Sequence, residues 1–398
     1  MSAPETADLV VVGAGTVGGW ASVFARESGA KRVIVLEAGS VGSGASSRAA
    51  GIVRAQGGTP ATVALGRWSI DFYRSQAARY GIDSGFRELG YTILAVTEAD
   101  EATAQERIAM QRSNGLVVRW VDVPEAQSLT PILGGSGFRG GSHVTTDGWI
   151  DPPRNVLAYT VAMRAAGVEL MERTAFRGFK RHGAVLSVET SAGPIETDRL
   201  LLTGGPGLHT VGRLAGTRIP AGGTRHTVCV TEPHAEFAVD RMAMVFDIGA
   251  GLYFRLEEGG LLFGYSNPDE PPGIAREIDW DFHARMRARL GELAPITRDL
   301  ALRKLWVATI DFTPDHFPIV GPALDPGGAP IDGVTVASAG GHGMMWGPAV
   351  ARVAADLAFD GQTDVVDVSD LGLERFDAAG RSRLTPDPIA LPFPHSAG

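Results

Sequence analysis

The chain has 398 residues, of which 44% are hydrophobic and 20% charged, and its formal net charge is −9. This length and composition leave room for two globular domains, and the negative charge without clustered Lys and Arg argues against nucleic-acid binding. The single cysteine, Cys229, excludes intrachain disulfides and cysteine-rich metal sites, so we expect no metal. No apolar run reaches membrane-span length and the first predicted strand begins by Asp8, so we expect no membrane segment, no signal peptide and a cytoplasmic location.

Residues 9–37 show the pattern of a strand, a glycine-rich turn, a helix and a second strand. In such a unit Gly13 permits the tight turn, Gly15 lets a pyrophosphate approach the backbone, and Gly18 lets the helix pack against the strand. The helix N-terminus offers unpaired N–H groups to the phosphates. Glu37, at the end of the second strand, can accept hydrogen bonds from both ribose hydroxyls and would repel a 2′-phosphate, which disfavours NADP. The motif predicts a bound adenine dinucleotide but does not separate NAD from FAD.

A run of small residues over 42–54 follows, which suits either a flexible loop or backbone pressed against a flat or anionic ligand. The elements predicted after it are a helix over 61–80, a strand over 91–96 and a charged, exposed helix over 100–113. Asp151 precedes two prolines, which predicts a helix N-cap and a helix over 152–166.

The second half of the chain first contributes further strands to the nucleotide domain, and its pattern then changes to short strands with few helices between them. Strands are predicted over 168–171, 184–190 and 199–203, and the last of them runs into the glycines at 204–207. Short strands over 227–231, 252–255, 261–264 and 305–310, interrupted by one helix over 279–291, predict an antiparallel sheet in a separate substrate domain. Cys229 lies in one of these strands and is interpreted as a buried structural thiol.

Near the C-terminus a strand over 333–338, a glycine turn over 340–343 and a helix over 347–359 repeat the strand–turn–helix pattern. The turn therefore places a second glycine-rich helix N-terminus, carrying His342, at the edge of the same sheet. The tail after Phe376 contains several prolines and is predicted to be extended without a core of its own.

Taken in order, these segments resemble the FAD-dependent amino-acid and amine oxidoreductases typified by D-amino-acid oxidase, glycine oxidase and sarcosine oxidase, in particular the sarcosine oxidase β-subunit and the proline and dimethylglycine dehydrogenases. The resemblance spans residues 8 to 361 through VVVGAGTVGG with VIVLEAG, SGASSRAAGIVR, DGWIDP, DRLLLTGG, GLYFR with LLFGY, and TPDHFPIVG with GGHGMMWGPAVARVAADLAFDG. It implies FAD and an α/β fold: a Rossmann-type FAD-binding domain from a discontinuous chain, and an α+β substrate domain built on an antiparallel sheet. The implied division is 1–85, 145–215 and 320–376 for FAD, 86–144 and 216–319 for substrate, and 377–398 for the extended tail.

The resemblance also implies a set of cofactor-binding residues. Ser46, Ser47 and Arg48 would lie along the pyrophosphate and isoalloxazine, and the backbone around Phe176 near the adenine. His342 would face the pyrimidine edge of the flavin with the neighbouring amides, where a helix N-terminus stabilises negative charge, and would add a donor or a positive charge, or merely close the turn. The full set is Gly13, Gly15, Thr16, Val17, Gly18, Glu37, Ala38, Ser46, Ser47, Arg48, Phe176, Gly204, Gly205, Gly341, His342, Gly343, Met344 and Met345.

On the substrate side the resemblance singles out Arg54, which matches an arginine that clamps the substrate carboxylate in monomeric sarcosine oxidase. A guanidinium holds a carboxylate bidentately, although a salt bridge between domains is the alternative role. Arg255, which follows Tyr253 on a strand similar to the YFRP element of the family, is a second carboxylate candidate with a structural alternative. Arg54, His342, Tyr253 and Arg255 are therefore the catalytic candidates.

Several residues depart from the family pattern. Where monomeric sarcosine oxidase links its flavin to a cysteine this chain has Ala308, and where dimethylglycine dehydrogenase uses a histidine it has Gly57. Cys229 fits neither place, so we predict non-covalent FAD.

Further departures concern the oxidant and the size of the substrate. The lysine that promotes oxygen reaction in monomeric sarcosine oxidase falls near Tyr253, the GHGFK lysine becomes Met345, and the carboxylate arginine of glycine oxidase falls near Ile310. The electron acceptor is therefore either O₂ or another molecule. The substrate is expected to be larger and more apolar than sarcosine, because the predicted site is crowded by Trp306, Met344, Met345 and Trp346.

The resulting hypothesis is oxidation of the C–N bond of a carboxylate-bearing amino acid, preferentially a secondary or N-substituted one, by hydride transfer to flavin N5, with hydrolysis of the imine. One alternative is a 2-hydroxy acid or polyol phosphate as substrate, with His342, His226 or His316 as base. Another is a flavin-binding subunit of a larger amine dehydrogenase, and a homo- or hetero-oligomer is possible in either case.

Overall fold

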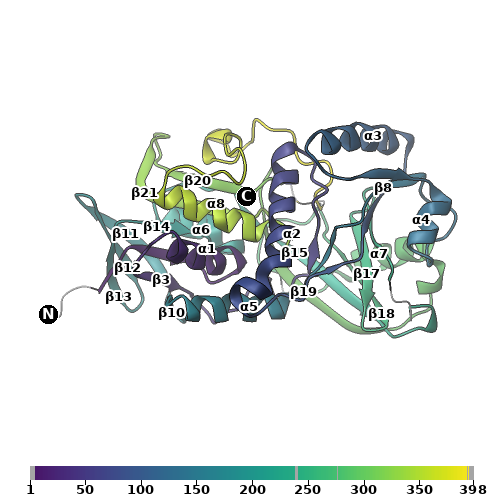
Figure 1. Cartoon of the computed structure of the whole chain (residues 1–398), viewed down its shortest axis with the longest axis horizontal. Coiled ribbons are helices and arrows are strands. Elements are labelled where there is room, and N and C mark those ends of the chain that lie inside the picture. The colour runs from purple at the N-terminus through teal and green to yellow at the C-terminus, as the bar shows by residue number, and fades with distance from the viewer. Residues whose placement is uncertain (1–4, 238–240, 276, 392, 394–398) are drawn as a thin grey trace.

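The computed structural model describes residues 5–237, 241–275, 277–391 and 393. Two large sheets organise the described chain, one of six strands and one of eight. They lie at opposite ends of the molecule, with the long helix α2 (Pro60–Tyr80) standing between them (Figure 1). Among the described residues, no helix combines the length and apolar character that crossing a membrane requires.

The six-stranded sheet has the order β10-β3-β2-β14-β21-β20 and is parallel except for β20. Its strands are β10 (Glu169–Met171), β3 (Val33–Leu36), β2 (Leu9–Val12), β14 (Leu200–Leu202), β21 (Pro330–Ser338) and β20 (Ile319–Leu324). Every residue of β2, β3 and β14 is buried, which is why these strands are continuous apolar runs rather than alternating ones.

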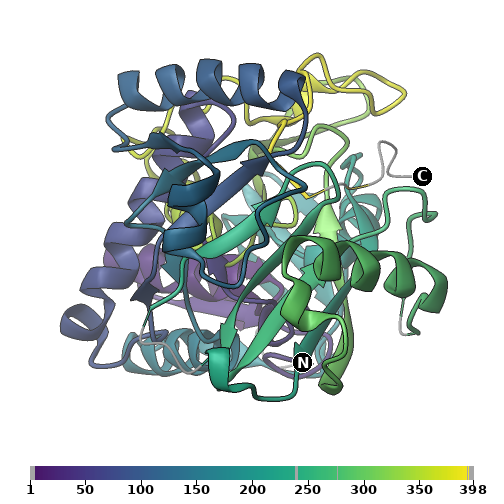
Figure 2. The same cartoon turned by 90° about the vertical axis from the view of Figure 1, so that its right-hand side faces the viewer.

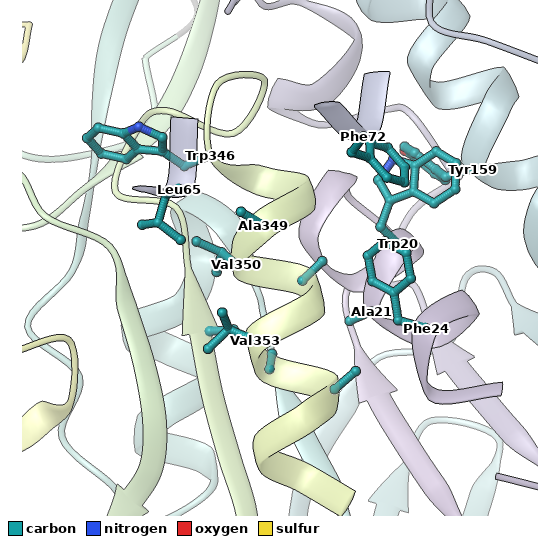
Figure 3. Packing of buried hydrophobic residues seen from close by; sticks show 14 of the residues in the cluster. Trp20, Ala21, Phe24, Leu65, Phe72, Tyr159, Trp346, Ala349, Val350 and Val353 are labelled. Carbon is teal, nitrogen blue, oxygen red and sulfur yellow. The ribbon is translucent and has the colours of Figure 1, made fainter. Parts of the chain in front are cut away.

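Helices α1 (Thr16–Glu27) and α8 (Gly347–Phe359) pack side by side on this sheet (Figures 1 and 3). Trp20 and Phe24 of α1 meet Phe72 of α2 edge-on, with ring centroids 4.9 and 5.7 Å apart. Both helices follow a parallel strand, α1 after β2 and α8 after β21. Their N-termini therefore emerge at the same edge of the sheet, where ligands of such sheets bind.

Helix α5 (Pro152–Ala165) begins where the sequence predicts. The Asp151 side chain accepts a hydrogen bond from the Arg154 N–H at 3.0 Å, and Pro152 occupies the first helical position. Asp151 is therefore confirmed as the N-cap.

The eight-stranded sheet has the order β19-β15-β18-β17-β16-β6-β8-β7, and its neighbours are antiparallel except β16 and β6. Its strands are β19 (Leu302–Phe312), β15 (Gly222–Thr231), β18 (Gly260–Tyr265), β17 (Leu252–Glu257), β16 (Met244–Asp247), β6 (Tyr91–Ala95), β8 (Gly140–Val144) and β7 (Arg119–Val121). Figure 2 shows α7 (Trp280–Leu293, green) in front of the strands and α3 (Glu98–Ser113, blue) above them. The predicted combination of a Rossmann-type sheet with an antiparallel sheet is confirmed, and the strand distribution supports the domain division above as a proposal.

Several short elements were not predicted. They are β1 (Glu5–Ala7), β13 (Gly193–Thr197) and β11 (Phe176–His182), which form a four-stranded sheet with the predicted strand β12 (Val185–Thr190), the three-stranded sheet of β4 (Ile52–Val53), β9 (Gly148–Trp149) and β5 (Arg87–Glu88), and helices α4 (Val123–Leu129) and α6 (Leu208–Leu214). β4 pairs with β9, which ties the chain just before Arg54 to the loop that precedes Asp151.

The tail over 377–391 contains neither helix nor strand, as predicted, but it does not lie free on the surface. The Ile389 and Phe393 side chains have no exposed area at all. The tail has no core of its own because it is packed into the core of the rest of the chain.

Candidate functional site

A cavity lies between the two large sheets and receives residues from both of them and from the tail. The six-stranded sheet contributes its glycine turns, with Glu37, Thr203 and the loop over 338–345; the eight-stranded sheet contributes Tyr91, His226, Phe246, Tyr253, Ile310 and Asp311; the tail contributes Ile389 and Leu391. The segment over 42–54 crosses between them, and Gly42 to Ser46, Ala49 to Ile52 and Arg54 line the cavity. Small residues at 42–54 therefore line the cavity rather than form a detached loop.

The turn before α1 is shaped for an anion. Gly13 has φ of +100°, and Gly15 caps α1 without a side-chain hydrogen bond and without an acidic residue in the first turn. A Cβ atom at Gly18 would overlap the Gly13 carbonyl oxygen and lie 2.8 Å from Thr203 Oγ1. The helix N-terminus is thus open to a phosphate, and its positive end would stabilise that charge.

Glu37 supports this turn from the neighbouring strand. Its Oε2 accepts a hydrogen bond from the Ala14 N–H at 3.0 Å, and its Oε1 accepts one from the Gly39 N–H at 2.8 Å. Ser46 Oγ accepts a hydrogen bond from the Thr16 N–H at 3.0 Å, so a side chain of the 42–54 segment lies against the first turn of α1. The residues present therefore fit an adenine dinucleotide, with its pyrophosphate on the backbone over 13–18.

The second glycine turn brings Gly341, His342, Gly343, Met344 and Met345 to the same cavity. His342 Nδ1 donates to the Gly340 carbonyl oxygen at 3.0 Å, because a carbonyl can only accept. Burial, assisted by the charge of Arg54, lowers the pKa of His342 to about 3. The imidazole is therefore neutral, and its Nε2, which has no partner among the described residues, is an acceptor.

This arrangement corrects the expectation that His342 supplies a donor or a positive charge to a flavin. Its only ring proton is on Nδ1 and is committed to the Gly340 carbonyl. Positive potential at this end of the cavity comes instead from the backbone of the turn that leads into α8, which has no acidic residue in its first turn.

A hydrogen-bonded chain runs along the substrate side of the cavity. His226 Nε2 lies 2.6 Å from Tyr253 Oη, and His226 Nδ1 lies 2.9 Å from Ser266 Oγ. Tyr253 stands opposite Gly264 in the strand register, and a Cβ atom at Gly264 would overlap the Tyr253 hydroxyl. Burial lowers the pKa of His226 to about 4 and raises that of Tyr253 well above its usual value, so both groups are neutral near pH 7.

Arg54 lies buried at the same side of the cavity. Its guanidinium donates to the backbone oxygens of Gln56 and Ile389, the latter at 2.5 Å, and it makes no ion pair with any described residue. The adjacent backbone is held by Asp147, whose carboxylate accepts from the Ala55 N–H at 2.8 Å and from Gln56 Nε2 at 3.1 Å. Arg54 is therefore a fixed buried cation facing a cavity, and not a bridge between charged surfaces.

Arg255, in contrast, is not at the cavity wall described above. Its Nε and Nη2 donate to the Ala50 carbonyl at 3.1 and 2.9 Å, its Nη1 donates to the Leu256 carbonyl at 2.9 Å and pairs with Glu257, and its guanidinium stacks on Trp149 at 4.1 Å. These protein groups already accept from Nε, Nη1 and Nη2 of the guanidinium, so it is not free to bind a carboxylate by two hydrogen bonds. The assignment of Arg255 as a carboxylate ligand is therefore corrected to a structural role.

Other predicted residues also point elsewhere. Ser47 Oγ donates to the Gly42 carbonyl and Arg48 to the Ser43 and Gly44 carbonyls, so these side chains hold their own loop together. Phe176 packs in the core beneath the six-stranded sheet. The described cavity lining excludes Ala38, Ser47, Arg48, Phe176, His316, Trp306 and Trp346.

Trp306 and Trp346, which were expected to crowd the site, therefore lie outside the cavity lining. Trp306 donates from Nε1 to the Arg48 carbonyl at 2.9 Å, and Trp346 lies fully buried at the start of α8 near Leu65 (Figure 3). Met344 and Met345 do line the cavity, as predicted.

Asp311 is the functional candidate that the sequence did not reveal. It lines the cavity at the end of β19, Ser338 Oγ donates to its carboxylate at 2.6 Å, and burial raises its pKa. An acidic residue at the end of an apolar strand was the available clue. Its partner Ser338 lies on the other sheet, so no local pattern could pair them.

Comparisons with known proteins agree with this geometry. A family model described as FAD dependent oxidoreductase (DAO) matches residues 8–357. The chain is similar to 4-methylaminobutanoate oxidase (formaldehyde-forming) of Paenarthrobacter nicotinovorans, at 26% identity over 96% of this chain and 47% of that protein, and to glycine oxidase of Pseudomonas aeruginosa, at 28% identity over 90% and 96%. The crystal structure of L-proline dehydrogenase from P. horikoshii matches with a TM-score of 0.83 at 25% identity, covering 91% of this chain and 96% of that one. This chain thus spans about half the length of the first of these relatives and nearly all of the other two.

Proposed function

This chain belongs to the DAO family of FAD-dependent oxidoreductases, whose members oxidise amino acids and amines, and on that premise we propose that its substrate is a carboxylate-bearing secondary or N-substituted amine. The observation that carries the proposal is Arg54, a buried guanidinium that forms no direct ion pair with any described residue and faces the cavity beside the Tyr253–His226 pair. A buried arginine gains most from a carboxylate that it can hold by two parallel hydrogen bonds. The substrate would supply that carboxylate.

FAD is the cofactor, and the described residues indicate how they would hold it. The backbone over 13–18 would receive the pyrophosphate, Glu37 the ribose, and the turn over 341–345 the ring system. When bound, FAD supplies a two-electron acceptor for the hydrogen on the carbon next to nitrogen.

We propose that the FAD is not covalently attached. The one thiol, Cys229, is fully buried in the cluster on the α7 face of the eight-stranded sheet, with its Sγ 3.9 Å from His283 Nδ1. Ala308 and Gly57 at the family attachment positions have no side chain that could form such a bond.

The residues around the amine are suited to orient it rather than to deprotonate it. An ordinary ammonium group has a pKa near 10, whereas burial holds that of His226 at about 4. Proton transfer from the ammonium to His226 would be uphill by about six pKa units, or about 8 kcal/mol. The amine therefore binds as the neutral species, and Tyr253 positions it by one hydrogen bond while Arg54 fixes the carboxylate.

A 2-hydroxy acid is the second candidate, because the unpartnered Nε2 of buried His342 is an acceptor next to the cavity. A third possibility is a flavin subunit that passes electrons to a partner, since this chain is only about half as long as the first relative.

Anaerobic mixing of the holoenzyme with N-methyl amino acids, primary amino acids and 2-hydroxy acids, followed at the flavin absorbance band, tests the proposal. Bleaching by an N-substituted amino acid is the expected result. Bleaching by hydroxy acids alone would favour the second candidate. Bleaching that is complete but turns over only with an added protein acceptor would favour the third.

A further inference from the structure

The tail enters the substrate side of the cavity beside Arg54 and supplies one of the two carbonyls that hold its guanidinium. Ile389 and Leu391 line the cavity, and the Ile389 carbonyl accepts a hydrogen bond from Arg54 Nη2 at 2.5 Å. The Phe393 ring packs on His342 and Phe312, with centroids 5.8 and 6.2 Å apart. The tail therefore contacts both the arginine and the glycine turn over 340–343.

The body of the protein is shaped to admit the tail. A Cβ atom at Gly58 would overlap Asp387 Oδ1 and lie 2.8 Å from Pro388 Cδ, and a Cβ atom at Gly341 would lie 2.7 Å from Phe393 Cζ. Both glycines are on segments far from the tail in sequence. At Gly58 the three nearest atoms to such a Cβ all belong to the tail, whereas at Gly341 the Asp311 carbonyl oxygen, 2.8 Å away, excludes a side chain together with Phe393.

Polar groups fix the tail in register. Asp387 is buried; its Oδ1 accepts from the Ile389 N–H at 2.9 Å and its Oδ2 from the Gly58 N–H at 3.4 Å. The Asp387 N–H donates to the Asp315 carbonyl at 3.1 Å, and Asp315 forms a fully buried ion pair with Arg375 at 2.7 Å. Because these hydrogen bonds fix both the Asp387 side chain and its backbone, the tail has a defined position at the edge of the cavity.

The tail also brings an acid that faces the buried cations here. The charge of Asp387 acts on Arg54 and on Arg107 of α3, which is 5% exposed and whose Nε and Nη1 have no partner among the described residues. Asp147 also acts on Arg54, so two carboxyl groups face these two guanidiniums, and burial raises the pKa of both carboxyls.

We propose that residues 387–391 and Phe393 are part of the substrate site: Ile389 and Leu391 bound the space for the apolar portion of the substrate, and the Ile389 carbonyl is the positioning group that orients Arg54 toward the substrate carboxylate. The inference rests on the proposed function, because it assumes that Arg54 binds that carboxylate. The substrate class it favours is an amino acid with an aliphatic group, since the tail presents aliphatic side chains to the cavity.

The test uses holoenzyme and two simple probes, acetate and hexanoate, whose dissociation constants are read from the perturbation of the flavin spectrum. The variants are a chain ending at Pro386 and Gly58→Ala, which pushes the tail away by steric overlap. Gly273→Ala is the matched control, because its Cβ would meet no atom within 4 Å. Docking of the tail is monitored by the rate of trypsin cleavage after Arg383, which is exposed.

We expect both tail variants to retain FAD, to bind acetate at least tenfold more weakly, and to lose the preference for hexanoate over acetate that the wild type shows. Gly58→Ala should also be cut faster after Arg383, whereas Gly273→Ala should match the wild type throughout. Dissociation constants within twofold of wild type in Gly58→Ala, with or without faster cleavage, would overturn the inference even if the truncated chain fails to fold.

Arg54→Met in the same assay separates this inference from the proposed function. If Arg54→Met binds both carboxylates as the wild type does, the proposed carboxylate clamp is wrong. If Arg54→Met loses binding but both tail variants keep it, the clamp stands and only the role of the tail is refuted.

Discussion

The Tyr253–His226 pair has a structural twin, which makes its role measurable. Tyr265 Oη lies 2.6 Å from His283 Nδ1, the same distance that joins Tyr253 Oη to His226 Nε2. Both tyrosines are buried in the eight-stranded sheet, but Tyr253 belongs to the cluster on the cavity face and Tyr265 to the cluster under α7. Phe at either position removes one hydroxyl and with it the 2.6 Å hydrogen bond to a buried imidazole nitrogen; among the described residues, His283 Nδ1 then keeps only the Cys229 Sγ contact at 3.9 Å.

We predict that Tyr253→Phe and Tyr265→Phe lower the free energy of unfolding by a similar amount, about 1–3 kcal/mol each. Only Tyr253→Phe should slow anaerobic flavin reduction, by about tenfold in kcat/KM, because one hydrogen bond to the amine is worth about 1.4 kcal/mol. The rise of kcat/KM with pH should keep its midpoint in Tyr253→Phe, since that midpoint belongs to the substrate amine. Equal slowing in both variants, or a shifted midpoint, would refute the positioning role.

Three further outcomes follow from the geometry. Gly18→Ala should lose at least 1–3 kcal/mol of FAD binding, about 5- to 150-fold in Kd by titration, because its Cβ would overlap the Gly13 carbonyl; unchanged affinity would refute the tight turn. Arg255→Met should lower the free energy of unfolding by about 3 kcal/mol in urea melts, while KM for the substrate stays within twofold of wild type. A raised KM would show that Arg255 does bind the substrate carboxylate. Because burial lowers the pKa of His226 to about 4, its contribution to stability should be full above about pH 6.5 and should fall by about 1.4 kcal/mol per pH unit as the pH drops toward 4. Buried Asp147 and Asp311 have raised pKa values and act in the opposite direction over this range, so the measurement is the difference in urea stability between wild type and His226→Gln; a difference that does not change with pH would contradict the prediction.

The nucleotide half of the site was predictable because its information is local. The spacing of Gly13, Gly15 and Gly18 and the carboxylate of Glu37 lie within one strand–helix–strand unit, and the structure places them at one cavity with the turn that carries His342. The proximity of the 13–18 turn and the 340–343 turn could also be inferred, because both turns follow strands of one parallel sheet.

The substrate half was only partly predictable because it depends on strand order. Tyr253 and His226 lie on β17 and β15, which are separated by β18, and their contact passes over Gly264. Arg255 shares the face of Tyr253 by alternation, yet it lies two residues further along, where the Ala50 carbonyl covers it. No sequence pattern gives either placement.

The tail shows the same limit. Its prolines predicted an extended chain, but the described tail turns at 378–380 and at 388–390, and composition does not say where such a segment docks. The Ile389 carbonyl meets Arg54 across 335 residues of sequence.

The most direct test of the account compares one N-methyl amino acid with its primary amide, which has the same amine but no carboxylate, by anaerobic reduction of the holoenzyme. We predict that the free acid bleaches the flavin at least 100-fold faster than the amide, because only the acid supplies a carboxylate that can pair directly with buried Arg54. Equal rates for the acid and the amide would contradict the central claim that this cavity selects its substrate by a carboxylate.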